Sequence, residues 1–171
     1  IVDLYTSSIV VSEVESHIRD DLQLASSETR NFIRKQICIK GLKGSEQFSA
    51  LFGDFREQGW DTYTLNQWIE FIDDTDCLVL ETNTVSLQDV LSDYFNGVAP
   101  FEEKQKKKYE FPDAIIIKSI KEFVNSGANQ VFVITKDQGW INAFSSFRNV
   151  IVVDDIIDIL KEIYSDVDPK I

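Results

Sequence analysis

The last third of the chain alternates short runs of apolar residues with segments of helical periodicity. Residues 131–134 and 149–153 are continuous apolar runs, as expected of strands that are buried on both faces. Apolar positions repeat at intervals of three and four over 112–127 and again over 156–163, which predicts helices. Strands that alternate with helices form a parallel sheet covered on both sides. We therefore expect an α/β fold with three α/β/α layers around a central parallel sheet.

The first third begins with a β-branched run at Ile9-Val10-Val11, which predicts a short strand. Ser12 and Glu15 follow with the spacing of a capping box, so a helix is expected to begin at Ser12 and to run toward Leu24. We expect the strands that contain Val10, Val133 and Val152 to lie parallel in one sheet, with their carboxyl ends on a common edge.

The middle of the chain carries mostly helical patterns. Apolar residues recur at helical spacings from 27 to 72, with breaks at Gly41, Gly44 and Gly53. Residues 77–80 are expected to form an edge strand, and residues 86–95 a helix capped by Ser86.

Size and composition indicate one folded domain over residues 1–171. The chain has 171 residues, of which 43% are hydrophobic and 27% charged, which is ordinary for a globular protein. There is no apolar stretch long enough to span a membrane, no basic signal-peptide start and only two cysteines, so a reduced, cytoplasmic protein is expected. The sequence contains no methionine, from which we expect that it begins inside a longer chain.

The net charge of −12 is the wrong sign for a protein that holds nucleic acid by bulk attraction. Clustered carboxylates that bind metal ions reverse the local charge, and a basic run at 104–108 adds positive charge. The same run also fits a solvated loop.

Acidic residues follow each predicted strand at the edge where open parallel sheets bind ligands. Glu13 follows the first run, Asp137 follows 131–134, and Asp154 and Asp155 follow the run that ends at Val153. Asp113, at the start of its helix, is expected at the same edge. Carboxylates gathered so closely repel one another unless a cation neutralises them, and oxygen ligands favour magnesium or manganese.

These acids also have structural explanations. An Asp at a helix N-terminus caps free amides and meets the positive end of the helix dipole, which alone accounts for Asp113 or Asp155. Glu15 is the return half of the capping box, which leaves Glu13 without a structural task. Trp140 is most simply a core aromatic.

Several segments resemble the second half of PIN domains, in particular a bacterial PIN-like subgroup. They are Tyr94 to Phe101, Glu110-Phe111-Pro112-Asp113-Ala114 and Val133-Ile134-Thr135-Lys136-Asp137-Gln138-Gly139-Trp140. In that family an Asp that opens a helix and another in a Thr-x-Asp step ligate metal, and these positions match Asp113 and Asp137. A Glu early in a helix after a short strand is a third ligand, which Glu13 resembles. We expect these three carboxyl groups in one small cleft.

The sequence departs from the PIN pattern at two places. PIN domains begin with a strand that ends in a metal-anchoring Asp; we expect this strand and its Asp upstream of Ile1, with Asp3 as the less favoured candidate. Gln138-Gly139 stands where many members carry a further acid, so a fourth ligand is in doubt.

The resemblance implies a metal-dependent endoribonuclease that hydrolyses RNA phosphodiester bonds with Mg²⁺ or Mn²⁺. Its catalytic and metal-binding residues are Glu13, Asp113 and Asp137. Thr135 is expected to support a carboxylate or a metal-bound water, and Lys107 and Lys108 to bind substrate phosphates. The expected partners are single-stranded or structured RNA and a protein inhibitor or other protein partner.

Two other functions fit the sequence. One is a PIN-like interaction module without catalysis, which the negative charge and Gln138 favour. The other is a phosphoryl-transfer or receiver-type α/β domain, which also places acids at strand ends but needs an Asp-bearing strand and a downstream Lys that the sequence does not present.

Overall fold

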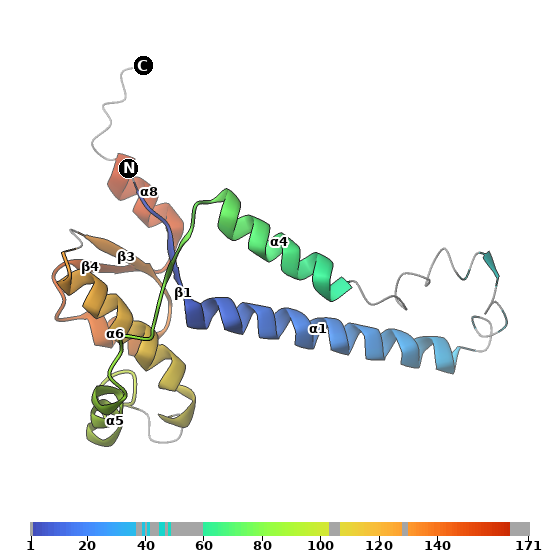
Figure 1. Cartoon of the computed structure of the whole chain (residues 1–171), viewed down its shortest axis with the longest axis horizontal. Helices are drawn as coiled ribbons and strands as arrows, with labels where there is room; N and C mark the ends of the chain where they lie inside the picture. The colour runs from blue at the N-terminus through green and yellow to red at the C-terminus, as the bar shows by residue number, and fades with distance from the viewer. Residues whose placement is uncertain are drawn as a thin grey trace, which may run out of the picture. The chain divides into compact units, whose positions relative to one another are not determined.

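The computed structural model describes residues 2–36, 39, 41, 45, 46, 48, 60–102, 107–127 and 130–164 (Figure 1). These residues form six α-helices, a short 3₁₀ helix and four short strands, which lie in two sheets of two strands each. The α/β class is therefore confirmed. The chain divides into two compact units, residues 1–79 and 80–171, and each is described by itself. Of the described helices, none is long and apolar enough to cross a membrane.

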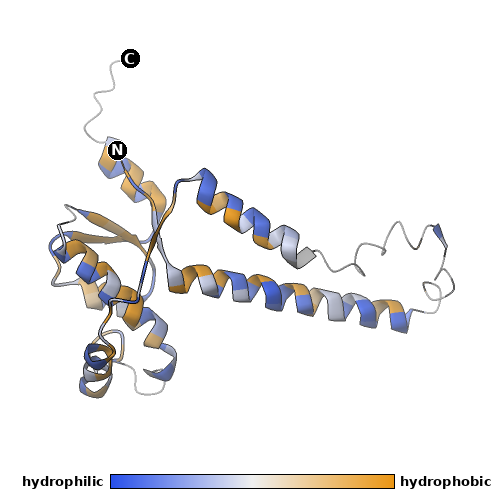
Figure 2. Ribbon diagram, viewed as in Figure 1, coloured by the Kyte–Doolittle hydropathy of each residue, from blue (hydrophilic) through white to orange (hydrophobic). Residues whose placement is uncertain are grey.

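The first unit is built on two helices and a pair of strands. Strand β1 (Tyr5–Ser7) leads into helix α1 (Ser8–Lys35), and helix α4 (Trp60–Asp74) precedes strand β2 (Leu78–Leu80). The two strands lie side by side, and the Leu78 N–H donates to the Leu4 carbonyl at 2.9 Å. In Figure 2 hydrophilic and hydrophobic residues alternate along α1, which has no fully buried residue.

The prediction of a strand at Ile9-Val10-Val11 is wrong, because these residues form the first turn of α1. The buried Ser7 side chain accepts a hydrogen bond from the Val10 N–H at 3.1 Å and starts the helix there. Val10 therefore belongs to no strand. Ser12 is also no helix cap, since its hydroxyl donates to the Ser8 carbonyl within the helix.

The second unit contains the parallel strands that the sequence predicted. Strands β3 (Val131–Ile134) and β4 (Val150–Val153) pair in parallel, with Val133 opposite Val152. Figure 2 shows both strands coloured mainly as hydrophobic residues. Helix α7 (Gln138–Phe144) connects them, and α8 (Ile156–Tyr164) follows β4.

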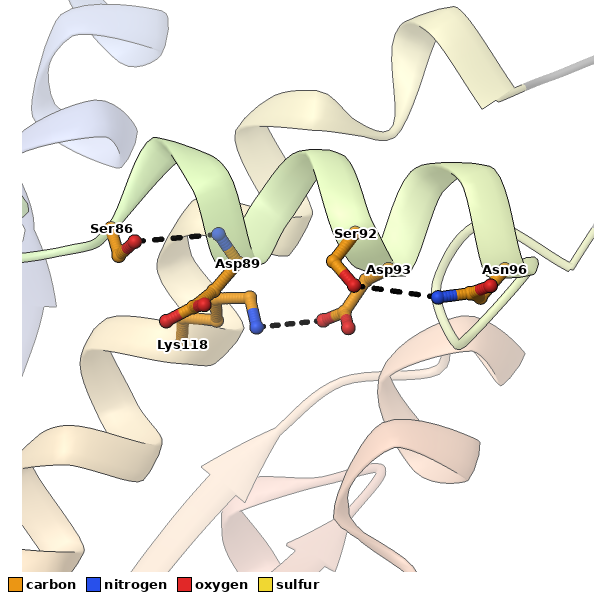
Figure 3. A network of polar contacts seen from close by, with 6 residues as sticks. All are labelled: Ser86, Asp89, Ser92, Asp93, Asn96 and Lys118. Carbon is orange, nitrogen blue, oxygen red and sulfur yellow. Dashed lines mark hydrogen bonds and ion pairs between the residues drawn. The ribbon is translucent and has the colours of Figure 1, made fainter.

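Helices α5 (Leu87–Asn96) and α6 (Phe111–Asn125) complete this unit, with a 3₁₀ turn at Lys107–Tyr109 before α6. Ser86 caps α5 as predicted, and its hydroxyl oxygen accepts from the Asp89 N–H. Figure 3 shows Lys118 of α6 reaching across to Asp93 of α5, where the two side chains form an ion pair at 2.7 Å.

The core of this unit lies between α6, α7 and the β3–β4 pair. Its buried residues are Ile117, Val124, Val133, Ala143, Phe144 and Val150. A second cluster joins Val90 of α5 to Phe101 and to Ala114 of α6. Because Asp113 and Trp140 lie on helices anchored in these clusters, the core determines where their side chains lie. Of the helices predicted between residues 27 and 72, the beginning of the range corresponds to the end of α1 and its last part to α4. Gly44 and Gly53 lie outside the described residues.

The core location of Ile117 predicts a large effect of truncation. Ile117 is 2% exposed, so Ile117→Ala should lower the free energy of unfolding by about 2–5 kcal/mol through lost burial and a residual cavity. Ile157→Ala, at a position on α8 that is 54% exposed, serves as the control and should change stability by about 0.5 kcal/mol or less. Chemical denaturation followed by circular dichroism measures both; equal losses would contradict the assigned core.

Candidate functional site

Asp113 lies in the first turn of α6, directly after Pro112. It is half-buried, and its Oδ1 accepts a hydrogen bond from the indole Nε1–H of Trp140 at 2.9 Å. None of the described backbone amides donates to its side chain, and the helix begins after Glu110 without a side-chain cap. Asp113 therefore caps no described amide, while its place in the first turn still puts its charge at the positive end of the α6 dipole.

Asp137 lies between β3 and α7 and caps that helix. Its Oδ1 accepts from the backbone N–H groups of Gly139 at 2.7 Å and Trp140 at 3.2 Å. The Thr135 hydroxyl oxygen accepts in turn from the Asp137 N–H at 3.1 Å, while the Thr135 N–H donates to the Val153 carbonyl. The turn that presents Asp137 is thus tied to the end of the parallel sheet.

Trp140 therefore donates one N–H to each of the two acids, which lie on elements far apart in the sequence. This common neighbour brings Asp113 and Asp137 together within the second unit, while their predicted shared cleft with Glu13 stays a prediction. In both carboxylates Oδ1 is the bonded oxygen. No described residue donates a hydrogen bond to either Oδ2, so each acid keeps one oxygen for another ligand.

The electrostatics of the pair favour a positive ligand. Burial raises the pKa of Asp113 above its ordinary value, the Trp140 hydrogen bond lowers it, and the negative charge of Asp137 raises it further. The net shift is upward, so the ionised form of Asp113 is held at a cost that a nearby cation would relieve.

Loop residues before the 3₁₀ turn pack against the start of α7. A Cβ atom at Gly139 would lie 3.0 Å from Asp137 Oδ1 and 3.0 Å from Pro100 Cβ, so any larger residue would crowd both neighbours and they would have to shift. Further along α7, Gln138 Nε2 donates to Asn142 Oδ1 at 2.8 Å, and Asn142 Nδ2 donates to Glu102 Oε2 at 2.7 Å. Asn142 thus links the Gln138 side chain of α7 to Glu102 of the preceding loop.

The donor set of the Asp113–Asp137 pair fits a hard divalent cation, because both acids offer carboxylate oxygens and no sulfur or imidazole lies among them. Among the residues that the structure describes, no three His, Cys, Asp or Glu side chains gather into a group able to hold a metal ion. Within the second unit the candidate centre therefore consists of two acids.

A family model described as a PIN domain matches residues 1–140 of the 171. The chain belongs to the PIN domain family. Neither a curated protein nor a solved structure matches the chain significantly. PIN domains are generally metal-dependent nucleases. Membership of the family therefore favours a nuclease over the receiver-type alternative.

The other predicted residues of the PIN site fall in several places. Glu13 is exposed in the second turn of α1, early in a helix after the short strand β1, but it belongs to the first unit. Its approach to Asp113 and Asp137 therefore stays a prediction. Lys108 is exposed, with Nζ 4.6 Å from the Tyr109 ring centroid, while the Lys107 side chain lies outside the described part.

The acids after β4 behave as structural residues in this PIN domain. Asp155 Oδ1 accepts from the Ile157 N–H at 2.8 Å at the start of α8, as its capping explanation predicted. Asp154 and Asp155 are both exposed and have no described contact with Asp113 or Asp137.

Sequence reasoning missed one residue of the site. Trp140 had been interpreted as a core aromatic, and its ring does pack against the core cluster, but its indole N–H reaches Asp113. The sequence signal for Trp140 was its position three residues after a helix-capping Asp, which places its backbone N–H at the cap.

The raised pKa of Asp113 predicts a pH-dependent stability effect. Because the folded pKa lies above the unfolded one, protonation of Asp113 favours the folded state at low pH, and this gain is lost as the pH rises through the folded pKa. With a chelator present, Asp113→Asn should therefore raise the melting temperature at neutral pH. The difference from wild type should shrink as the pH falls through the raised folded pKa toward 3.8, the ordinary value, and should be lost below it. Asp89→Asn on α5 controls for the loss of one charge, and a difference that does not vary with pH would contradict the shift.

The two tasks of Asp137 are separable by substitution. Asp137→Ala removes the helix cap and should cost about 1 kcal/mol of stability, whereas Asp137→Asn retains a capping oxygen and should cost little. Thermal unfolding without metal compares the two. Equal losses in both variants would show that the charge, rather than the cap, stabilises α7.

Proposed function

We propose that this PIN domain, residues 1–171, is a metal-dependent ribonuclease that hydrolyses RNA phosphodiester bonds. The observation that supports this best is the pair Asp113–Asp137, joined through Trp140, in a chain of a family that commonly acts on RNA. Each acid has one oxygen fixed by the protein and one without a described donor. Such an arrangement suits a divalent cation better than a purely structural role, because it leaves two negative charges close together.

In this proposal Glu13, Asp113 and Asp137 hold Mg²⁺ or Mn²⁺ through carboxylate oxygens. When bound, the ion supplies an activated water as nucleophile and stabilises negative charge in the transition state and on the leaving oxygen. The protein keeps its ligands in place: the Trp140 indole orients Asp113, while Thr135 and the first amides of α7 orient Asp137.

Substrate binding depends on local positive charge, because the chain as a whole carries −12. We assign phosphate contacts to Lys107 and Lys108, which lie in the 3₁₀ turn immediately before α6, the helix that carries Asp113. Tyr109 in the same turn is 67% exposed and offers an aromatic face on which a single-stranded base can stack.

The alternative is a PIN-like interaction module without catalysis, with a protein partner in place of RNA. Gln138 favours it, because its amide is engaged with Asn142 and contributes no carboxylate to the centre. Both functions retain the fold, and only the enzyme requires the charge of the acid pair.

The test is cleavage of a mixed single-stranded RNA pool with Mn²⁺ by the complete natural protein, including any residues that precede Ile1. Asp113→Asn and Asp137→Asn keep side-chain volume and one accepting oxygen but remove a charge. Each should lower the cleavage rate by more than about 100-fold. Loss of a residue that only supports a metal ligand costs about 10–100-fold, and loss of the ligand itself should cost more. Glu13→Gln should have the same effect.

Asp89→Asn is the matched control, because it makes the same change at an exposed position of α5 outside the centre. It should cleave like the wild type. Absence of cleavage by the wild type with any divalent ion, or equal cleavage by all variants, would favour the interaction module.

A further inference from the structure

Trp140 holds both acids of the candidate centre with two different groups. Its indole Nε1–H donates to Asp113 Oδ1 at 2.9 Å, and its backbone N–H donates to Asp137 Oδ1 at 3.2 Å. The first bond joins α7 to α6 across 27 positions of sequence. One residue therefore bonds two carboxylates on helices that the core already holds together.

The ring of Trp140 is anchored, so the direction of its N–H is defined. It packs against the cluster that contains Ile117 and Phe144, and its ring centroid lies 6.2 Å from that of Phe144. Because Gly139 has no side chain, Pro100 can contact the turn that immediately precedes Trp140. A side chain fixed along its length by packing loses little conformational entropy when it makes a hydrogen bond.

The chemistry of indole suits this position better than that of other donors. The indole N–H can only donate, and the ionised Asp113 carboxylate can only accept, so the two groups match. Because the acceptor is a carboxylate, the bond is stronger than one to a neutral oxygen. Lys or Arg would also donate, but their positive charge would neutralise the acid pair and compete with a cation. A neutral donor orients the acid and leaves its negative charge available.

We propose that Trp140 is a positioning residue of the metal centre: it holds Oδ1 of Asp113 and Oδ1 of Asp137, so that the second oxygen of each acid is the one available to a divalent cation. This inference rests on the proposed function. Trp140 itself touches neither the ion nor the RNA.

Trp140→Phe in the complete protein is the direct test, because it keeps an aromatic ring for the core and removes the indole N–H. Loss of an outer partner should weaken Mn²⁺ binding about tenfold or more, measured by calorimetry or by the electron paramagnetic resonance signal of free Mn²⁺. Trp68→Phe is the matched control, because the Trp68 indole N–H has no described partner; its Mn²⁺ affinity should equal that of the wild type.

A second measurement leaves Trp140 intact. The three tryptophans of the chain give three indole N–H signals in a ¹⁵N-labelled sample, and the signal lost in Trp140→Phe, or the remaining one after Trp68→Phe and Trp60→Phe, identifies Trp140. This signal should move when Mg²⁺ is added, and the movement should disappear in Asp113→Asn. The Trp68 signal should not respond to Mg²⁺ in either protein.

The outcomes separate the two proposals. A wild type that binds Mn²⁺ and cleaves RNA, together with unaltered Mn²⁺ affinity in Trp140→Phe, overturns the positioning role and leaves the ribonuclease proposal standing. A wild type that binds no divalent ion overturns both. If Trp140→Phe does not fold, a Trp140 indole signal that ignores Mg²⁺ in the wild type overturns the positioning role alone.

Discussion

Burial of one carboxylate beside another is the constraint that the surroundings of Asp113 and Asp137 have to meet. Burial of the Asp113 carboxyl costs free energy, and the nearby negative charge of Asp137 adds to that cost. The fold offsets it with donors that carry no charge: the Trp140 indole on Asp113 and the first amides of α7 on Asp137. None of the described donors to the two acids therefore carries a positive charge.

The position of the pair follows from the parallel sheet and the helix ends next to it. The β3–β4 ladder extends to Thr135, whose N–H bonds the Val153 carbonyl, so the turn after β3 begins at a defined point. Two residues later Asp137 starts α7, and the first turn of α7 packs under Pro100 because Gly139 has no side chain. Buried residues of α6 and α7 share one core cluster, which holds the two helix starts together.

Sequence patterns predicted this region well where burial dictates the residue type. The continuous apolar runs of β3 and β4 and the Ser86 cap of α5 were read correctly, since burial and capping leave local marks. The run at Ile9-Val10-Val11 misled because β-branched residues cost a helix only a few tenths of a kcal/mol each, less than the Ser7 cap contributes. The indole bond from Trp140 to Asp113 was not predictable, because a hydrogen bond across 27 positions leaves no periodic trace.

Strands β3 and β4 provide an internal comparison that separates a helix cap from a candidate ligand. Each is followed by an Asp whose Oδ1 accepts an N–H from the next helix: Asp137 from Gly139, and Asp155 from Ile157. The residue three positions later differs. After Asp155 it is Asp158, paired with Lys161 at 2.9 Å, whereas after Asp137 it is Trp140, which reaches a second acid. Capping therefore explains Asp155, and it explains one oxygen of Asp137, but it does not explain the second acid that Trp140 brings beside Asp137. In the proposed function, a cation shared by Asp113 and Asp137 accounts for that second acid.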